Sequence, residues 1–258
     1  MCNYNDNLNL LKFSMYSELP ISIIVPVYNE GSNIKLFLQT LEKAIQIKHE
    51  VLIIYDFDKD DTVPVARKLQ KHFPNMRLIR NNLGVGLVNA CKIGFIKSKG
   101  EFIVVMPGDI ADNPKDIKEM YELAKKGYDI VCGTRYSKGG KQIGGGFIKT
   151  TLSRIAGLTT PLLLGIPTSD LTNGFKMYNR IIFDKIKIES KGGWEFAMEI
   201  LIKAHLLNFK ITETPSTWKE RQSGKSKFKL FKWLPKYVYW YWWGVNQRMM
   251  KQFKTIFN

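Results

Sequence analysis

Residues 99–114, with the sequence KGEFIVVMPGDIADNP, decide the fold. Lys99-Gly100 is typical of a turn that leads from a helix into a strand, because glycine adopts a positive φ without steric cost. Residues 102–106 are all apolar and include β-branched side chains, as in a strand that is buried on both faces. Pro107-Gly108 then ends the strand. The segment therefore predicts a central strand of an α/β sheet.

Two carboxylates, Asp109 and Asp112, follow this strand directly. Open α/β sheets bind their ligands at the carboxyl ends of the strands. Hard cations such as Mg²⁺ take one or two carboxylates and complete their coordination with water and substrate phosphates. The alternative role is to cap the helix that we expect to begin near Pro114. We favour the metal for Asp109, and for Asp112 we favour the cap over a place as second metal ligand.

Strand and helix patterns alternate along the first half of the chain. Apolar residues recur at helical spacing between 34 and 45, after Ser32 as a candidate cap. Further helices are expected at 62–72, from the glycine turn at 84–86 to 98, and at 114–126. The expected strands are 21–27, 51–55, 76–79, 102–106 and 129–133. This alternation predicts a doubly wound, largely parallel α/β sheet.

The pattern changes after Arg135. Residues 137–146 contain five glycines and are expected to form a mobile loop. Residues 148–164 are helical in pattern, but they are too few to cross a bilayer and are interrupted by Arg154. A turn at 170–176, a helix near 194–207 and a strand at 210–214 complete this part.

The composition is that of an ordinary globular protein. Among 258 residues, 45% are hydrophobic and 24% are charged, which excludes a disordered chain. Three cysteines are too few and too scattered for a disulfide framework or a zinc site. The first twenty residues lack the pattern of a secretory signal. We therefore expect a protein of the reducing cytoplasm.

Positive charge is concentrated at the C-terminal end. The net charge is +16, of which the last forty residues contribute +9. Residues 225–245 interleave lysines with nine aromatic side chains. Such a basic end points to phosphates of a nucleotide, a nucleic acid or a membrane surface. A nucleic-acid binder is disfavoured, because no RNA- or DNA-binding motif is present.

The aromatic tail allows two interpretations. Tryptophan and tyrosine favour the headgroup region of a bilayer, and lysines favour anionic lipid, so the tail can lie on a membrane without crossing it. Alternatively, it forms a C-terminal helix that packs on the protein's own core or on a dimer partner. An amphipathic face is not apparent around Trp240, and both interpretations stay open.

Several motifs in order give the chain a resemblance to a known family. They are IIVPVYNE (23–30), the acids after the second strand, the glycine turn 84–86, VVMPGD (104–109), GTRY (133–136), the Asp170–Lys176 turn and the segment 213–227. Together they resemble family 2 glycosyltransferases of the GT-A fold, above all the dolichyl- or polyprenyl-phosphate sugar transferases. The resemblance covers roughly residues 21–227, which leaves 1–20 as an extension and 228–258 as the basic aromatic, membrane-interfacial tail.

The resemblance implies roles for individual residues. The nucleotide of a nucleotide-sugar donor is assigned to Pro26, Tyr28, Glu30 and Asp56, together with the turn of Gly84 and Gly86. For Glu30 the alternative is stabilisation of a helix N-terminus. The contacts to the donor diphosphate and to an acceptor phosphate are assigned to the cationic side chains of Arg135, Arg221 and Lys227. For Lys227 the alternative is a solvated position on the surface.

Two motifs depart from the family pattern. The usual Asp-Asp-Gly-Ser is replaced by Tyr55-Asp56-Phe57-Asp58, in which only the Asp56 position is kept. The usual Asp-x-Asp is replaced by Pro107-Gly108-Asp109, which keeps only the second acid. Asp109 then holds Mg²⁺ or Mn²⁺ with the diphosphate and water, or with help from Asp112.

The implied reaction is an inverting transfer of a sugar from a nucleoside diphosphate to an acceptor oxygen. A polyprenyl-phosphate acceptor is already anionic, and we expect it, with the protein peripheral on the cytoplasmic face of the membrane. A saccharide hydroxyl would instead need a general base, for which Asp170 is the candidate; its alternative role is to brace the turn before Gly174. A non-catalytic nucleotide-sugar or lipid-binding relative is the remaining alternative.

Overall fold

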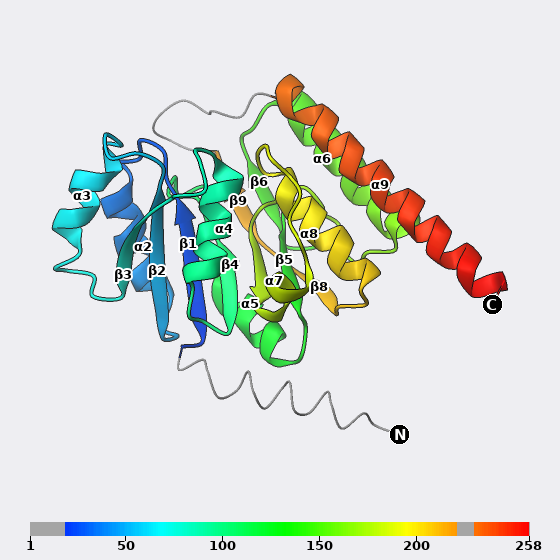
Figure 1. Cartoon of the computed structure of the whole chain (residues 1–258), viewed down its shortest axis with the longest axis horizontal. Coiled ribbons are helices and arrows are strands. Elements are labelled where there is room, and N and C mark those ends of the chain that lie inside the picture. The colour runs from blue at the N-terminus through cyan, green and yellow to red at the C-terminus, as the bar shows by residue number, and fades with distance from the viewer. Residues whose placement is uncertain (1–18, 221–229, 258) are drawn as a thin grey trace.

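A seven-stranded sheet forms the centre of the molecule in the computed structural model, which describes residues 19–220 and 230–257 (Figure 1). The strand order is β3-β2-β1-β4-β7-β5-β8. The strands are β1 (Ile21–Pro26), β2 (His49–Tyr55), β3 (Met76–Arg80), β4 (Phe102–Val105), β5 (Ile130–Thr134), β7 (Lys176–Asn179) and β8 (Ile211–Pro215).

The sheet is mostly parallel, as the alternating pattern predicts. β1 pairs in parallel with β2 and β4, β2 with β3, and β5 with β8. Only β7 is antiparallel, and it lies between β4 and β5. The carboxyl ends of the six parallel strands therefore share one edge of the sheet, and β7 begins at that same edge.

Helices cover both faces of the sheet. α2 (Ile34–Ala44), α3 (Thr62–Leu69) and α5 (Asp116–Lys125) bury their apolar residues in one core, while α4 (Leu87–Lys97), α7 (Ile181–Lys185) and α8 (Glu195–Leu206) bury theirs in the other. Within β1, Ile23 faces the first core and Ile24 the second, as the two-residue period of a strand requires. The two cores explain why the central strand β4 is apolar throughout.

Both predicted helix caps are wrong. α2 begins at Ile34 with Asn33 as its N-cap, not Ser32, and α5 begins at Asp116 with Lys115 as its N-cap, not Asp112. The turn before α5 is formed locally by Asn113, whose Oδ1 accepts a hydrogen bond from the Lys115 N–H at 3.2 Å. Asp112 is thus left without the capping role.

The glycine-rich segment 137–146 is not simply a loop. It contains strand β6 (Lys141–Ile143), which pairs in parallel with β9 (Thr217–Lys219) in a separate two-stranded sheet. The partner strand lies more than seventy residues later in the chain, so a pattern read locally could not reveal the pairing. This small sheet stands beside the carboxyl-end edge of the main sheet.

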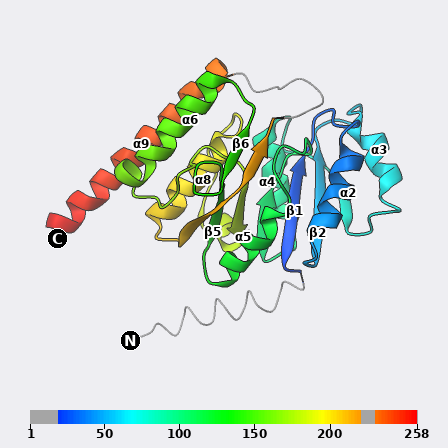
Figure 2. The ribbon, with the colours of Figure 1, turned by 180° about the vertical axis from the view of Figure 1, so that it is seen from behind.

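Two long helices lie side by side at one end of the molecule (Figures 1 and 2). α6 (Phe147–Thr159) continues into the π-helix η1 (Thr160–Leu164), and α9 (Leu230–Phe257) packs against α8 and η1. Trp240 and Val245 of α9 are buried in the core. No helix within 19–220 and 230–257 combines the length and apolar character that a membrane crossing needs.

Gly157 allows α6 to approach the segment that precedes β7. A Cβ on Gly157 would collide with the Ser169 carbonyl oxygen. We expect Gly157→Ala to lower the free energy of unfolding by about 1–3 kcal/mol, because the backbone must shift to accommodate the methyl group. Gly146→Ala is the matched control, since a Cβ there meets nothing within 4 Å. Equal unfolding midpoints for the two variants in urea would contradict the close approach.

Candidate active site

Asp56 fixes the glycine turn to the end of β2. Its Oδ1 accepts a hydrogen bond from the Asn81 Nδ2 at 2.7 Å, and its Oδ2 accepts one from the Gly86 N–H at 2.9 Å. Gly84 and Gly86 have φ values of 100° and 134°, which favour glycine strongly. The predicted turn is therefore present, and Asn81 is a participant that sequence reasoning missed, although it lies within the same NNLGVG stretch.

The other acids after β2 serve the neighbouring loop. Asp60 accepts a hydrogen bond from the Asn29 N–H at 3.0 Å, and Asp61 accepts one from the Gly31 N–H at 2.8 Å. These bonds tie the loop after β1 to the loop after β2. Asp60 and Asp61 therefore stabilise the loop after β1, whereas Asp56 bonds to the glycine turn.

An aromatic pair stands at the ends of β1 and β2. The rings of Tyr28 and Phe57 meet edge to face with centroids 5.6 Å apart, and about half of the Tyr28 side chain is exposed. Pro26 is the last residue of β1. The sequence analysis assigned the nucleotide to Tyr28 but gave no role to Phe57, which replaces the usual glycine of the motif.

Glu30 is buried and bonded to its surroundings. Its N–H donates to the Thr62 Oγ1 at 2.9 Å, and its Oε2 accepts from the Asn33 Nδ2 at 2.7 Å. Asn33 is the N-cap of α2. These bonds support the alternative role at the start of a helix, which the sequence left open for Glu30.

Asp109 and Asp112 lie just past the end of β4, as predicted. Asp109 Oδ1 accepts a hydrogen bond from the Ala111 N–H at 3.2 Å. Asp112 is buried, and its Oδ1 has no hydrogen-bond partner. Burial, and next the charge of Asp109, raise the pKa of the Asp112 carboxyl to about 7. A buried carboxylate with an unpartnered oxygen beside a second carboxylate is costly unless a cation compensates its charge.

This pair fits a divalent cation with few protein ligands. Within residues 19–220 and 230–257, no group of three or more His, Cys, Asp or Glu side chains could hold a metal ion. Mg²⁺-type ions are commonly held by one or two carboxylates together with substrate phosphates and water. The unpartnered Oδ1 of Asp112 is thus available as a second ligand beside Asp109.

The raised pKa of Asp112 predicts that the stability of the metal-free protein depends on pH. Its folded-state pKa is raised to about 7, above the value near 4 of an unfolded aspartate. The folded state therefore favours the protonated Asp112 carboxyl, and this stabilisation is complete below about pH 4. As the pH rises from about 4 to about 7, the free energy of unfolding falls by at most ~1.4 kcal/mol per pH unit. Denaturant unfolding in EDTA should show a smaller fall between pH 5 and pH 8 for Asp112→Asn than for the wild type. Parallel curves would contradict the raised pKa.

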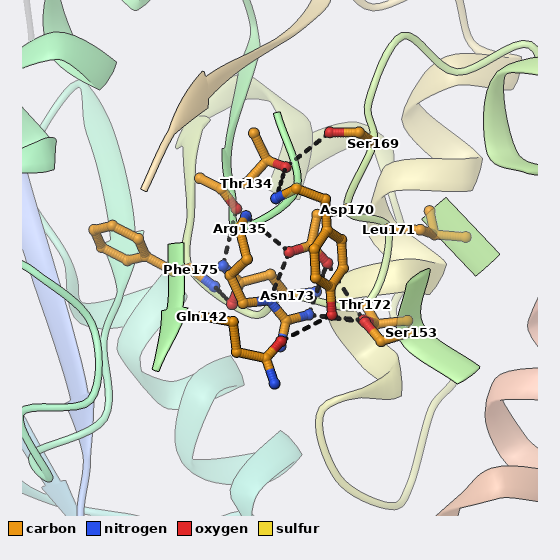
Figure 3. Close-up of polar contacts among 12 residues, drawn as sticks. Thr134, Arg135, Gln142, Ser153, Ser169, Asp170, Leu171, Thr172, Asn173 and Phe175 are labelled. Atoms are coloured by element: carbon orange, nitrogen blue, oxygen red, sulfur yellow. Dashed lines mark hydrogen bonds and ion pairs between the residues drawn. The ribbon is translucent and has the colours of Figure 1, made fainter. Parts of the chain in front are cut away.

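Arg135 and Asp170 form a buried ion pair at the end of β5 (Figure 3). Arg135 Nε lies 2.7 Å from Asp170 Oδ2, and Arg135 Nη2 lies 2.8 Å from Asp170 Oδ1. Asp170 is fully buried, and its charge is the main cause that raises the pKa of the Arg135 guanidinium. From the sequence we expected Arg135 to bind phosphate and Asp170 to act as a base or to brace the turn, and we did not predict that they form an ion pair.

Hydrogen bonds connect this ion pair to α6 and to the turn before β7 (Figure 3). Arg135 Nη2 donates to the Ser153 Oγ at 2.9 Å and to the Thr172 Oγ1 at 3.1 Å. Asn173 donates its N–H to Asp170 Oδ1 at 3.2 Å and its Nδ2 to the Gly133 carbonyl oxygen at 2.8 Å. Asp170 therefore braces the turn, which is the second of the two roles that the sequence allowed.

Lys176 adds a buried cation beneath the turn. Its side chain is fully buried, and its Nζ donates to the carbonyl oxygens of Asn173 and Leu171. Burial lowers its pKa, while the nearby Asp170 opposes that effect. Sequence reasoning included Lys176 in a motif without giving it a role.

Strand β9 connects the carboxylates to the C-terminal part of the chain. Asp112 forms an isolated bridge with Trp218, and the Lys219 N–H donates to the Ala111 carbonyl oxygen at 2.8 Å. The predicted phosphate contacts Arg221 and Lys227 lie outside the described residues. The other predicted site residues all lie at the carboxyl-end edge of the sheet, in a nucleotide-side group around Asp56 and a second group around Asp112 and Arg135.

Comparison with known proteins places this arrangement in a family. The family model described as Glycosyl transferase family 2 matches residues 22–187. A dolichol-phosphate mannosyltransferase of Pyrococcus furiosus is 30% identical over 216 residues, which are 82% of this chain and 60% of that protein. A polyprenol monophosphomannose synthase of Mycolicibacterium smegmatis is 28% identical over 212 residues, which are 80% of this chain and 79% of that protein. The chain thus spans about 60% of the length of the Pyrococcus relative.

Solved structures confirm the predicted GT-A fold. Glucosyl-3-phosphoglycerate synthase from Mycobacterium tuberculosis, solved with Mn²⁺, uridine diphosphate and phosphoglyceric acid, superposes with a TM-score of 0.65 at 15% sequence identity. The match covers 88% of this chain and 79% of that one. At this identity the likeness concerns the fold, whereas the family model covers more than half of the chain. The predicted resemblance is therefore confirmed, and the chain belongs to glycosyl transferase family 2.

Proposed function

We propose that the protein is a metal-dependent, inverting glycosyltransferase that moves a sugar from a nucleoside-diphosphate sugar to a polyprenyl phosphate. Two relatives with 28–30% identity over most of this chain carry names of dolichol- or polyprenol-phosphate mannose transfer. The order of motifs from residue 23 to 227 supports the same branch of the family. The reaction forms a bond between the acceptor oxygen and the anomeric carbon, and the nucleoside diphosphate leaves.

The nucleotide binds at the ends of β1 and β2 in this proposal. The exposed ring of Tyr28, with Phe57 against it, offers a surface on which a base can stack. Asp56 has two oxygens with further acceptor capacity toward a ribose hydroxyl or a base N–H. The glycine turn at 84–86, held by Asp56, brings backbone close to the same place.

The donor diphosphate lies toward Asp109 and Asp112. These two residues would hold Mg²⁺ or Mn²⁺, and the unpartnered oxygen of Asp112 supports this assignment. The ion, when bound, neutralises the charge that develops on the leaving diphosphate. Asp109 and Asp112 orient the ion, and the small sheet of β6 and β9 covers the backbone beside Asp112.

We choose a phosphate as the acceptor because of the hydrogen bonds and the burial of Asp170. Both of its oxygens bond to Arg135, and the side chain is fully buried. To take a proton, this carboxylate would have to give up a buried, bidentate ion pair, which is costly. An acceptor phosphate is already anionic and needs no general base. We assign Arg221 and Lys227 to that phosphate, and we place the protein peripherally on the cytoplasmic face of the membrane.

A panel of nucleotide sugars tests the proposal. Each is incubated with the full-length protein, Mg²⁺ or Mn²⁺, and a short-chain polyprenyl phosphate, and nucleoside diphosphate release is measured. We expect release with one donor that requires both the cation and the acceptor. Binding of a nucleotide sugar without release for any acceptor would identify a non-catalytic relative and overturn the proposal.

A further inference from the structure

The outer face of α6 and η1 is apolar although it faces solvent. Of the residues between 147 and 163 that are exposed, all but Thr151 and Arg154 are apolar. The exposed fraction reaches 84% for Phe147, 74% for Leu158 and 76% for Leu162. The apolar members are Phe147, Ile148, Leu152, Ile155, Leu158, Pro161, Leu162 and Leu163. Such a continuous patch on a soluble surface marks an interaction site.

α9 presents a second apolar stripe beside the first. Trp240 and Val245 point into the core, whereas other large side chains of the same helix are exposed. The exposed ones are Val238, Tyr239, Trp242, Met249, Met250 and Phe253. One side of the aromatic tail therefore packs on the core, as the second interpretation from the sequence predicts, while the other side faces outward and leaves the membrane interpretation open.

The two stripes lie next to each other because α9 bonds to the C-terminal end of α6 and to η1. The Tyr241 hydroxyl donates to the Thr159 Oγ1 at 2.6 Å, and the Arg248 Nη1 donates to the Leu162 carbonyl oxygen at 2.7 Å. α6 and α9 run alongside each other in both views of the ribbon (Figures 1 and 2). We call the exposed apolar residues of 147–163 and of α9 the docking face.

The positive charge around the docking face favours an anionic partner. Residues 147–164 and 230–257 contain no acidic residue and seven basic ones. The basic residues are Lys149, Arg154, Lys232, Lys236, Arg248, Lys251 and Lys254. A second copy of this chain would bring like charges together, whereas an anionic bilayer offers both phosphates for the cations and an apolar layer for the side chains. Tryptophan and tyrosine at the surface fit the headgroup level.

We propose that the docking face binds an anionic lipid bilayer, with α6 and α9 lying in the headgroup plane. The sequence led us to expect only the tail at a membrane, and the docking face adds α6 to that surface. The inference rests on the proposed function, because a lipid-linked acceptor would reach the enzyme at this surface. Ser153 on the buried side of α6 bonds to Arg135 at 2.9 Å. The ion pair of Arg135 and Asp170 then lies about one helix diameter, ~10 Å, from the lipid.

Vesicle sedimentation with full-length protein tests the docking face. The vesicles are phosphatidylcholine alone or phosphatidylcholine mixed with phosphatidylglycerol. We expect binding to the mixed vesicles that weakens as salt is raised. The double variant Leu158→Glu/Leu162→Glu should bind at least ~10-fold more weakly, because two apolar side chains no longer enter the lipid. The matched control is Leu36→Glu/Ile96→Glu, which changes residues with 58% and 66% exposure on α2 and α4 and should bind like the wild type.

A second readout separates this inference from the proposed function. Transfer to a water-soluble, short-chain polyprenyl phosphate should be equal for the wild type and the Leu158/Leu162 variant, since neither residue touches the site. Loss of vesicle binding with retained transfer supports the docking face. Wild-type vesicle binding by that variant, while Trp242→Glu abolishes it, would show that α9 acts without α6 and overturn the inference. Light scattering that shows a dimer which the Leu158/Leu162 variant dissociates would identify a second copy as the partner instead.

Discussion

Asp109→Asn is expected to abolish sugar transfer, lowering kcat/KM by ~10³-fold or more. The neutral amide removes a formal charge from the carboxylate pair, Asp109 and Asp112, to which we assign the cation. In the proposed mechanism, loss of the ion would leave the charge that develops on the leaving diphosphate without compensation. The variant should fold normally, because the amide still accepts the hydrogen bond of the Ala111 N–H.

The matched control for Asp109→Asn is Asp58→Asn. Asp58 also follows a strand of the sheet, but its partner is Arg80 in an exposed ion pair at 3.1 Å, which contributes little. Transfer rates with a fixed Mn²⁺ concentration, together with calorimetric titration of the nucleotide sugar, measure the effect. Near-full activity of Asp109→Asn in Mn²⁺ would remove Asp109 from the metal site.

Asp170→Asn is expected to lower the free energy of unfolding by about 3–5 kcal/mol, because it leaves the Arg135 guanidinium buried without its counter-charge. Transfer should fall with the folded fraction. The control is Glu189→Gln, which removes one exposed partner of Lys203 and should cost under ~1 kcal/mol. Urea unfolding of both variants measures the difference.

The double variant Arg135→Gln/Asp170→Asn separates bracing from general-base catalysis. Two amides in place of the pair remove the uncompensated charge, so stability should recover in part relative to Asp170→Asn. If Asp170 braces the turn, the folded double variant keeps measurable transfer to a phosphate acceptor. A loss ~10²–10⁴-fold greater than that of Arg135→Gln alone, in a fully folded double variant and with a changed pH profile, would instead indicate a general base.

The fold was predictable because its signals are local. The apolar run at 102–106 and the helical spacing from Ile34 to Ile45 both depend on residues a few positions apart, and both are buried as expected. Strand β6 was missed because its five neighbouring glycines favour a loop and its partner, β9, comes much later. The cap assigned to Asp112 failed because Asn113 forms the turn before α5.

The site was predictable only one residue at a time. The motif order located Asp56, Asp109, Arg135 and Asp170 at the carboxyl-end edge, where the structure places them. What could not be predicted is which of them bond to each other. Arg135 and Asp170 are 35 positions apart, and their pairing depends on how β7 enters the sheet between β4 and β5. The docking face was hidden for a similar reason, because the aromatics of α9 point both into the core and outward.

The acceptor group is tested most directly by two lipids that differ only in the phosphate. A short-chain polyprenyl phosphate and the polyprenol of the same length are each incubated with the protein, the labelled donor and Mn²⁺, and label in the organic extract is measured. The proposed function predicts labelled lipid from the phosphate and none from the alcohol, since Asp170, the candidate base for a hydroxyl acceptor, is held in the ion pair with Arg135. Label in the polyprenol, with none in the polyprenyl phosphate, would contradict it.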